Sequence, residues 1–269
     1  MKKVALVTGA EGFIGSYLAR FLQEQGWDVF AGHRVAGAED AFPNLRNLRY
    51  VQCELCDAKQ VASVLHEAGP THVFHLGAQS LPTLSWEHPV ETFESNIMGS
   101  LNLFEALRYM EEKPIVVSAC SSAEYGHVPA SRIPVSEDEP LHPLHPYGIS
   151  KVCLDLLAHQ YFLDYGISAI NIRLFNTTGP QTAIRLSGTK VEVREAEHLL
   201  RPSDEKIIFG STRKIRKDTG WKPLVSMQQT LASMLEYWDR ADDQLNQCGE
   251  RSQPYVPSFL YREKSIGLE

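Results

Sequence analysis

Tyr147 and Lys151 lie four residues apart in the segment HPYGISKVCLDLLAHQY, where a helix is predicted to begin. Four residues make about one helical turn, so the two side chains are expected on the same face. A lysine ammonium beside a phenol stabilises the phenolate and lowers the pKa of the phenol. Two solvent-facing residues at a common spacing would give the same pattern. Other motifs of the chain are therefore needed to distinguish a catalytic pair from two surface residues.

A serine pair precedes this helix in the segment SACSSAEYG, at the end of a predicted strand. Ser121 or Ser122 could hydrogen-bond a substrate oxygen there, although a serine that caps a turn is the simpler interpretation of either one alone. A serine, Tyr147 and Lys151 could together carry out one reaction, the exchange of a proton and a hydride with a carbinol. The phenol passes a proton to or from a carbinol oxygen while a nicotinamide exchanges a hydride, and Ser121 holds that oxygen. We therefore predict that the Tyr147–Lys151 pair is catalytic.

A glycine-rich turn, TGAEGFIGS, follows the first predicted strand and opens the first predicted helix. Gly9, Gly12 and Gly15 would permit a tight turn, close approach of the backbone to a pyrophosphate, and close helix–strand packing. A glycine triplet alone could be a plain turn. Its position between strand and helix favours a dinucleotide site.

The end of the second predicted strand indicates which dinucleotide binds. An acidic residue there would bind the ribose 2′-hydroxyl of NAD, but the segment reads FAGHRV, with His33 and Arg34 and no carboxylate. A guanidinium suits a 2′-phosphate, so NADP is favoured and NAD remains possible. Glu54, after the third strand, is either an acceptor for the adenine amino group or a surface carboxylate.

Composition limits the class of protein. The chain has 269 residues and a formal net charge of −7, so no general attraction to nucleic acid or to an anionic membrane is expected. No apolar run approaches the roughly 20 residues of a membrane span. Five cysteines, an odd number, favour reduced thiols in the cytoplasm. His72 and His75 should point to opposite faces of a strand, so no metal site is expected.

Short apolar runs alternate with amphipathic segments in the first half of the chain, which predicts an α/β fold with a doubly wound parallel sheet of the Rossmann type. Ligands of such a sheet bind at the carboxyl ends of its strands. The predicted strands are residues 3–9, 28–32, 48–54, 72–77, 115–120 and 168–176. The predicted helices are residues 14–25, 59–67, 92–110 and 148–164.

The periodicity changes after residue 176. We expect a dinucleotide-binding domain over 1–178, a small and incomplete C-terminal substrate lobe over 179–241, and a tail over 242–269 without clear periodicity.

Several motifs together resemble the extended short-chain dehydrogenases/reductases that act on nucleotide sugars. These motifs are TGAEGFIG, HLGAQS, NIMGSLNLFEAL, EYG, YGISK and RLFNTTGP. RLFNTTGP and RPSDEKIIFGSTRKIRKDTGWKP look most like the branch of GDP-mannose 4,6-dehydratase and GDP-4-keto-6-deoxy-mannose reductase. The resemblance covers residues 1–180 and roughly 199–238.

The resemblance implies roles for individual residues. It places Ser121, Tyr147 and Lys151 in a catalytic triad, with the last two also touching the cofactor. The other implied cofactor contacts are Gly9, Gly12, Phe13, Ile14, Gly15, Arg34, Glu54, Leu55, Gly77 and Ala78. The implied substrate contacts are Ser80, Ser122, Asn176 and Arg201.

Two departures from the family pattern affect the expected chemistry. Dehydratases of this kind carry a glutamate where this chain has Ala123, and Glu124 follows one place later, where alternation should turn it away. Elimination therefore lacks its expected base. Between Pro180 and Leu186 the family carries several dozen more residues, including a further strand, so the last strand is expected to be a bare edge.

Three functions remain open on this sequence. The first is an NADP-dependent reductase of a nucleotide-linked 4-keto-6-deoxy sugar, with GDP as the favoured nucleotide. The second is an epimerase or dehydratase whose cofactor is reduced and reoxidised within one cycle. The third is a cofactor-binding regulatory homologue without turnover.

A homodimer is also expected, because two predicted helices carry more apolar residues than one buried stripe requires. The alternative is a pair of helices buried within one subunit. The residues concerned are Ile97, Met98, Leu101, Leu103, Phe104, Leu107, Val152, Leu154, Leu156 and Leu157.

Overall fold

The computed structural model describes residues 3–34, 48–175, 208–226, 228–230 and 232–233. These fall into two compact units, of which the first holds 3–34, 48–175 and 208–214, and the second holds the described residues from 215 onward. The candidate site lies in the first unit. Helix α9 (Arg213–Thr219) crosses the boundary between the two.

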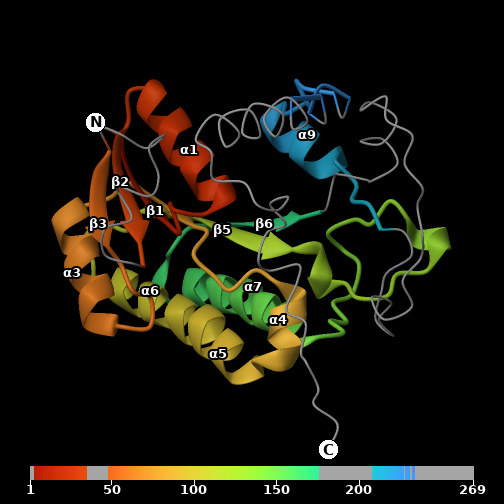
Figure 1. The fold of residues 1–269 in the computed structure, drawn as a ribbon, viewed down its shortest axis with the longest axis horizontal. Helices are drawn as coiled ribbons and strands as arrows, with labels where there is room; N and C mark the ends of the chain where they lie inside the picture. The colour runs from red at the N-terminus through yellow and green to blue at the C-terminus, as the bar shows by residue number, and fades with distance from the viewer. Residues whose placement is uncertain (1–2, 35–47, 176–207, 227, 231, 234–269) are drawn as a thin grey trace, which may run out of the picture. The chain divides into compact units, whose positions relative to one another are not determined.

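Six parallel strands form one sheet in the order β3-β2-β1-β4-β5-β6 (Figure 1). This order reverses direction at β1, as in a doubly wound Rossmann sheet, and confirms the predicted fold class. The strands are β1 (Val4–Thr8), β2 (Asp28–His33), β3 (Arg49–Gln52), β4 (His72–His75), β5 (Ile115–Ser121) and β6 (Ala169–Leu174).

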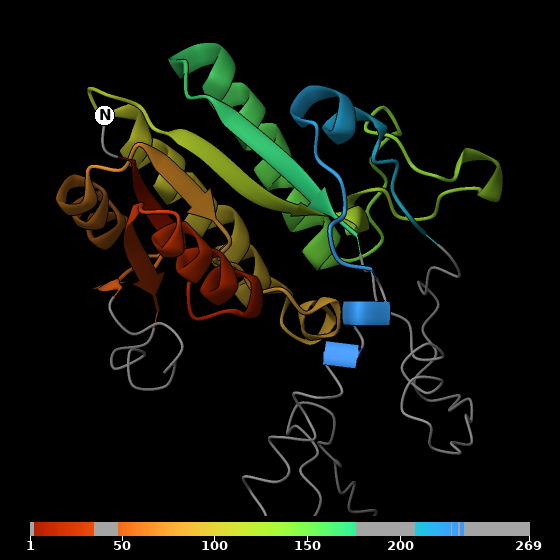
Figure 2. The ribbon, with the colours of Figure 1, turned by 90° about the horizontal axis from the view of Figure 1, so that it is seen from above.

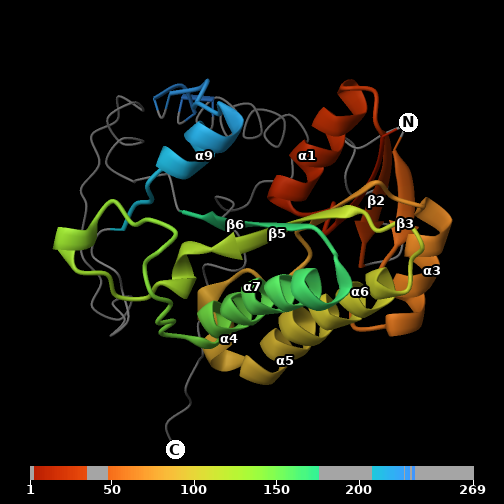
Figure 3. The same cartoon turned by 180° about the vertical axis from the view of Figure 1, so that it is seen from behind.

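Helices cover both faces of the sheet (Figures 1 and 3). On one face, α1 (Phe13–Glu24) buries Ala19 and Leu22 against β1 and β2. The other face carries α3 (Ala58–Ala68), α6 (Gly99–Arg108) and α7 (Pro146–Tyr165), which share the larger core with the strands. The fully buried members of that core include Leu6, Val61, Val73, Leu103, Phe104, Leu107, Val116, Leu154 and Ile167.

Local sequence explains where α7 begins and ends. Pro146 occupies the first turn, where its missing N–H costs nothing, and the His145 ring accepts a hydrogen bond from the Gly148 N–H at 3.0 Å. Gly166 ends the helix in the left-handed region, with φ 68°. Tyr147 and Lys151 therefore lie in the first two turns of a helix whose ends are fixed.

The helix predicted over 92–110 consists of three segments. These are α5 (Pro89–Phe93), a π-helical turn η2 (Glu94–Met98) and α6. The wider turn brings Asn96 into the interior, where it is 3% exposed. A further helix, α4 (Pro82–Glu87), was not predicted, because six residues are too few to show a helical period.

Strand β6 is the last strand of the sheet within the described ranges and pairs only with β5 there. Its side chains alternate between half-buried and exposed, and Ile170 is 55% exposed. Helix α1 lies over the other half of the sheet and does not cover β6 (Figure 2). The bare edge expected at β6 stays a prediction, because residues 176–207 lie outside the described residues.

A second, small apolar cluster lies beyond the ends of β5 and β6. Tyr125, Val128 and Val135 are buried there with Phe175 and Ile208 packed against them. The loop between β5 and α7 contains the short turns η3 (Ser122–Glu124) and η4 (Ala130–Arg132). A parallel β-bridge between Val135 and Gly210 connects this loop to the segment around residue 210.

No helix of the described residues is long and apolar enough to cross a membrane.

Candidate active site

The glycine turn after β1 is too tight for side chains. Gly9 has φ +67°, and a Cβ there would lie 2.7 Å from the Gly77 Cα. A Cβ on Gly15 would lie 2.1 Å from the Gly9 carbonyl oxygen. Glycine at Gly9 and Gly15 therefore lets the β1–α1 turn, the first turn of α1 and the end of β4 approach one another closely.

The start of α1 offers backbone N–H groups to an anion. Gly12 is the N-cap and supplies no side-chain cap, and the first turn contains no acidic residue. The exposed side chains of Phe13 and Ile14 flank these groups. The glycine cradle and the uncapped helix start fit the pyrophosphate of a dinucleotide.

A buried histidine fixes the ends of β1 and β4 beside this cradle. Thr8 Oγ1 accepts from the N–H groups of Leu76 and Gly77, at 3.2 and 3.1 Å, so its own hydroxyl donates to His75 Nδ1 at 3.0 Å. His75 Nε2 then carries the hydrogen and donates to Ser100 Oγ at 2.9 Å. Burial lowers the pKa of His75 to about 3, so the ring is neutral.

Three of the predicted adenosine contacts follow the carboxyl ends of β2 and β3. Arg34 directly follows β2 and is exposed. Its backbone N–H donates to the Glu11 carboxylate at 3.2 Å. Glu54 follows β3, but one of its carboxylate oxygens accepts from the Cys56 N–H at 3.1 Å. Leu55 is buried and lies directly against Gly77, since a Cβ on that glycine would be 2.9 Å from Leu55 Cδ1.

Ser121, Tyr147 and Lys151 come together at the carboxyl end of β5. Ser121 ends the strand, and its hydroxyl lies close to Tyr147, where it acts to lower the pKa of the phenol. Lys151 Nζ lies 5.8 Å from the centre of the Tyr147 ring and donates to the Ala119 carbonyl at 2.8 Å. The three side chains can therefore act on one substrate oxygen and on the cofactor beside it.

The pKa of Tyr147 differs from the expectation. Burial raises it, and the hydrogen bond from Ser121 opposes that effect without reversing it. Lys151 does not lower it, because the ammonium bonds the Ala119 carbonyl and burial lowers the pKa of Lys151 itself. The pKa that Lys151 was predicted to lower is thus raised instead, and Tyr147 is a protonated phenol at neutral pH.

A buried asparagine joins the loop after β4 to α7. Asn96 accepts from the Gln79 N–H at 2.7 Å and donates to the Gln79 carbonyl and to Ser150 Oγ, both at 2.9 Å. This fixes the 77–80 loop, in which Ala78 is half-buried and Ser80 is exposed. Sequence reasoning missed Asn96 and the histidine at the end of β4. Their roles depend on partners far apart in the chain.

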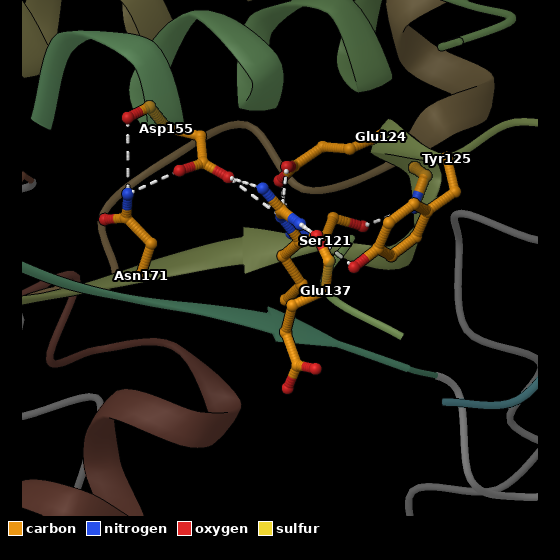
Figure 4. A network of polar contacts seen from close by, with 8 residues as sticks. Ser121, Glu124, Tyr125, Glu137, Asp155 and Asn171 are labelled. Atoms are coloured by element: carbon orange, nitrogen blue, oxygen red, sulfur yellow. Dashed lines mark hydrogen bonds and ion pairs between the residues drawn. The ribbon is translucent and has the colours of Figure 1, made fainter. Parts of the chain in front are cut away.

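The remaining predicted substrate residues lie in different places. Ser122 is half-buried beside Ser121 in η3. Asn176 and Arg201 lie outside the described residues. Ala123 occupies the position where a dehydratase base was expected, and Glu124 is completely buried, with its carboxylate bonded inside the protein (Figure 4).

Comparisons with known proteins agree with this geometry. The family model described as GDP-mannose 4,6 dehydratase matches residues 6–192. GDP-mannose 4,6-dehydratase from Vibrio cholerae serotype O1 is 31% identical over 84% of this chain and 63% of its own length. UDP-glucose 4-epimerase from Corynebacterium glutamicum is 32% identical over 78% of this chain and 60% of its own length. The chain thus spans about half to two thirds of the length of these relatives.

Solved structures of epimerases share the fold. UDP-glucose 4-epimerase from Thermotoga maritima, solved with UDP-glucose, has a TM-score of 0.77 at 22% identity, covering 88% of this chain and 99% of its own. UDP-glucose 4-epimerase from Brucella ovis, in complex with NAD, has a TM-score of 0.60 at 28% identity, covering 65% and 52%. The chain belongs to the GDP-mannose 4,6-dehydratase family, within the extended short-chain dehydrogenases/reductases of the epimerase/dehydratase type.

Proposed function

We propose that this protein is an NAD(P)-dependent oxidoreductase that acts on a nucleotide sugar. In its most specific form, the proposal is reduction of a 4-keto-6-deoxy sugar linked to a nucleoside diphosphate, with GDP as the nucleotide. The observation that carries it is the protonated Tyr147 phenol, beside Ser121 and one turn from Lys151, at the carboxyl edge of the sheet. A phenol that keeps its proton suits the reductive direction, in which the carbonyl oxygen has to gain one.

The bound dinucleotide supplies the hydride that the carbonyl carbon receives. Tyr147 gives its proton to the carbonyl oxygen, and the O–H bond of the phenol breaks as that of the new alcohol forms. The Ser121 hydroxyl holds the same oxygen in line. Lys151 is proposed to contact the dinucleotide, and the phenolate that remains regains its proton from solvent.

Reduction accounts for the residues better than elimination does. A 4,6-dehydratase needs a base beside the transient ketone, and Ala123 has no ionisable group. The neighbouring Glu124 is bonded to the Ser121 N–H and to Arg173 and is completely buried. Neither residue could remove a substrate proton without rearrangement of the turn.

NADP is the proposed cofactor. Arg34 is exposed at the end of β2, where the adenosine ribose of a Rossmann ligand lies, and no acidic residue of β2 stands there. The Glu11 carboxylate beside the Arg34 N–H favours a 2′-hydroxyl instead. NAD is therefore the alternative that the cofactor experiment has to exclude.

The proposal extends to assembly and to the sugar-nucleotide contacts. Of the ten apolar residues expected at a dimer interface, four are buried within the subunit, whereas Met98 and Leu156 remain 47% and 60% exposed. We take the exposed pair as the centre of a homodimer contact. Ser80, Ser122, Asn176 and Arg201 are proposed contacts of the nucleotide sugar.

The test is turnover of a GDP-4-keto-6-deoxy sugar with NADPH, followed by absorbance of the reduced cofactor and by product analysis. We expect one NADPH oxidised per sugar reduced, and a loss of about 10²–10⁴-fold in kcat for Tyr147→Phe with dinucleotide binding retained. Tyr109→Phe is the matched control, since Tyr109 is 75% exposed. Equal activity of wild type and Tyr147→Phe would contradict the role of Tyr147.

An epimerase is the second candidate, because UDP-glucose 4-epimerases are among the relatives. It would convert its sugar without net consumption of cofactor. Dinucleotide binding without turnover of any nucleotide sugar would instead indicate a regulatory homologue.

A further inference from the structure

Glu124 is the only carboxylate among the described residues that is completely buried. Its Oε1 accepts a hydrogen bond from the Ser121 N–H at 2.8 Å, and the Ser121 hydroxyl accepts one from the Ala123 N–H at 3.1 Å. Serine and glutamate thus cap the same short turn reciprocally. The position of the Ser121 side chain depends on the Glu124 carboxylate.

Arg173 connects this turn to the helix that carries the other two candidates. Its Nε lies 3.1 Å from Glu124 Oε2 and 2.8 Å from Asp155 Oδ2, and its Nη2 lies 2.6 Å from the same aspartate oxygen. Asp155 follows Lys151 by one turn of α7 and Tyr147 by two. The guanidinium therefore joins the end of β5, the edge strand β6 and α7 (Figure 4).

The remaining contacts of Arg173 complete the arrangement. Its Nη1 donates to the Tyr125 hydroxyl at 3.0 Å and to the Glu137 carbonyl at 3.2 Å. The Glu137 side chain points away from the cluster (Figure 4). Arg173 is the cation that directly bonds both buried carboxylates.

The cluster places a thiol and two carboxylates beside one guanidinium. The Cys120 thiol and the carboxylates of Glu124 and Asp155 lie within 4.8 Å of one another. The groups that face Glu124 are Cys120 from β5, Tyr125 from the following turn, Arg173 from β6, and Tyr147, Lys151 and Asp155 from α7. One guanidinium is thus shared by two carboxylates.

We propose that Glu124 is a positioning residue for the reaction: its ionised carboxylate, bonded to the Ser121 amide and to Arg173, fixes the serine against the helix of Tyr147 and Lys151. The proposal rests on the proposed function for the reaction itself, while the geometry it invokes can be measured without turnover. Protonation of Glu124 removes its charge from the ion pair with Arg173, which then keeps Asp155 as its charged partner. The turn that carries Ser121 loses its connection to α7.

The pKa of Glu124 places this change of protonation near neutral pH. Burial raises it to about 7, with the Asp155 carboxylate acting in the same direction and the Ser121 N–H and Arg173 opposing. Ionised Glu124 therefore predominates above pH 7 and protonated Glu124 below it. Turnover is expected to fall as the pH drops through 7.

The experiment combines a titration with kinetics. The ¹⁵N–¹H resonance of the Ser121 amide is followed from pH 5 to pH 9 in wild type, in Glu124→Gln and in Glu137→Gln. We expect the resonance to titrate near pH 7 in wild type and Glu137→Gln and to be pH-independent in Glu124→Gln. Glu137→Gln is the matched control, because its backbone carbonyl still accepts from Arg173.

The kinetic arm measures kcat and the KM for dinucleotide over the same range. Glu124→Gln mimics the protonated residue, so we expect its kcat at pH 8 to be roughly tenfold lower, without the acid limb and with unchanged KM. A Ser121 amide that does not titrate in wild type, or a Glu124→Gln enzyme with the wild-type pH profile, would overturn the proposal. An amide that titrates as expected in a protein without nucleotide-sugar turnover supports the positioning of Ser121 and contradicts the proposed function.

Discussion

Arg173 bonds Asp155 through Nε at 2.8 Å and Nη2 at 2.6 Å, and this pair ties the edge strand β6 to α7. Both side chains are largely buried, at 20% and 15% exposed. Lysine at position 173 would keep the charge but could not bond Asp155, Glu124 and Tyr125 at once. Arg173→Lys is expected to lower the free energy of unfolding by about 2 kcal/mol, measured by urea denaturation.

Arg132→Lys provides the comparison for this substitution. Arg132 pairs with Glu139 at 2.8 Å, but its side chain is 56% exposed, so the same change should cost less than about 1 kcal/mol. Equal losses for the two variants would mean that the buried network adds nothing beyond an ordinary surface ion pair.

Glu124 should make the protein less stable as the pH rises. Its pKa is about 7 in the folded protein and 4.5 for an ordinary glutamate side chain, so the folded state binds the proton more tightly. Its contribution to stability is complete below pH 4.5 and is lost as the pH rises through 7. Relative to Glu124→Gln, the free energy of unfolding of wild type should fall by on the order of 2 kcal/mol between pH 5 and pH 8.

Denaturant melts of both proteins at each pH give this difference, and Glu137→Gln serves as the control. A wild-type curve parallel to that of Glu124→Gln would show that Glu124 ionises normally.

The contribution of His75 to stability changes with pH in the opposite direction. Its pKa is about 3 in the folded protein and 6.5 for an ordinary histidine side chain, so the folded state binds the proton less tightly. The stability it contributes is present above pH 6.5 and is lost as the pH falls toward 3. Between pH 7 and pH 5 the loss should be about 2 kcal/mol, and His75→Gln should remove that part of the slope.

His66→Gln is the control for this change, because His66 lies exposed in the last turn of α3. Thermal melts at constant ionic strength provide the measurement. An unchanged acid slope in His75→Gln would assign the acid sensitivity to other groups.

Most of the fold could be predicted from the sequence because each strand is a short apolar run with a turn on either side. The glycine triplet identified the first βα unit, and the parallel order followed from the alternation of strands and helices. The π-turn at Asn96 was missed because apolar spacing alone does not distinguish an α-turn from a π-turn.

The site was less accessible to sequence reasoning. The spacing of Tyr147 and Lys151 predicted their shared helix, but the direction of the Tyr147 pKa depends on burial, which the spacing does not report. Glu124 and Arg173 are 49 residues apart, and their ion pair depends on the pairing of β5 with β6. The alternation of side chains along the chain predicted that Glu124 points away from the site. It could not predict that Arg173 is the partner of Glu124.

Arg34 should decide between the two dinucleotides. A guanidinium that bonds the 2′-phosphate contributes about 1.5–3 kcal/mol, so Arg34→Ser should weaken NADPH binding by roughly ten- to a hundredfold. Binding of NADH should change little. Isothermal titration of both cofactors gives the ratio, and Arg20→Ser, an exposed change on α1, is the control. Equal losses for NADPH and NADH would remove Arg34 from the 2′ position.

The helices on the larger core face should also determine assembly. Met98 and Leu156 are exposed on η2 and α7, whereas most other apolar residues of these helices are buried or half-buried. If they lie at the centre of a homodimer contact, Leu156→Glu buries a charge against the second subunit and should shift the protein to a monomer. Phe21→Glu, at a comparably exposed position of α1 on the opposite face, should leave the dimer intact. Light scattering over a range of concentrations measures both, and a wild-type protein that stays monomeric throughout would contradict the proposed contact.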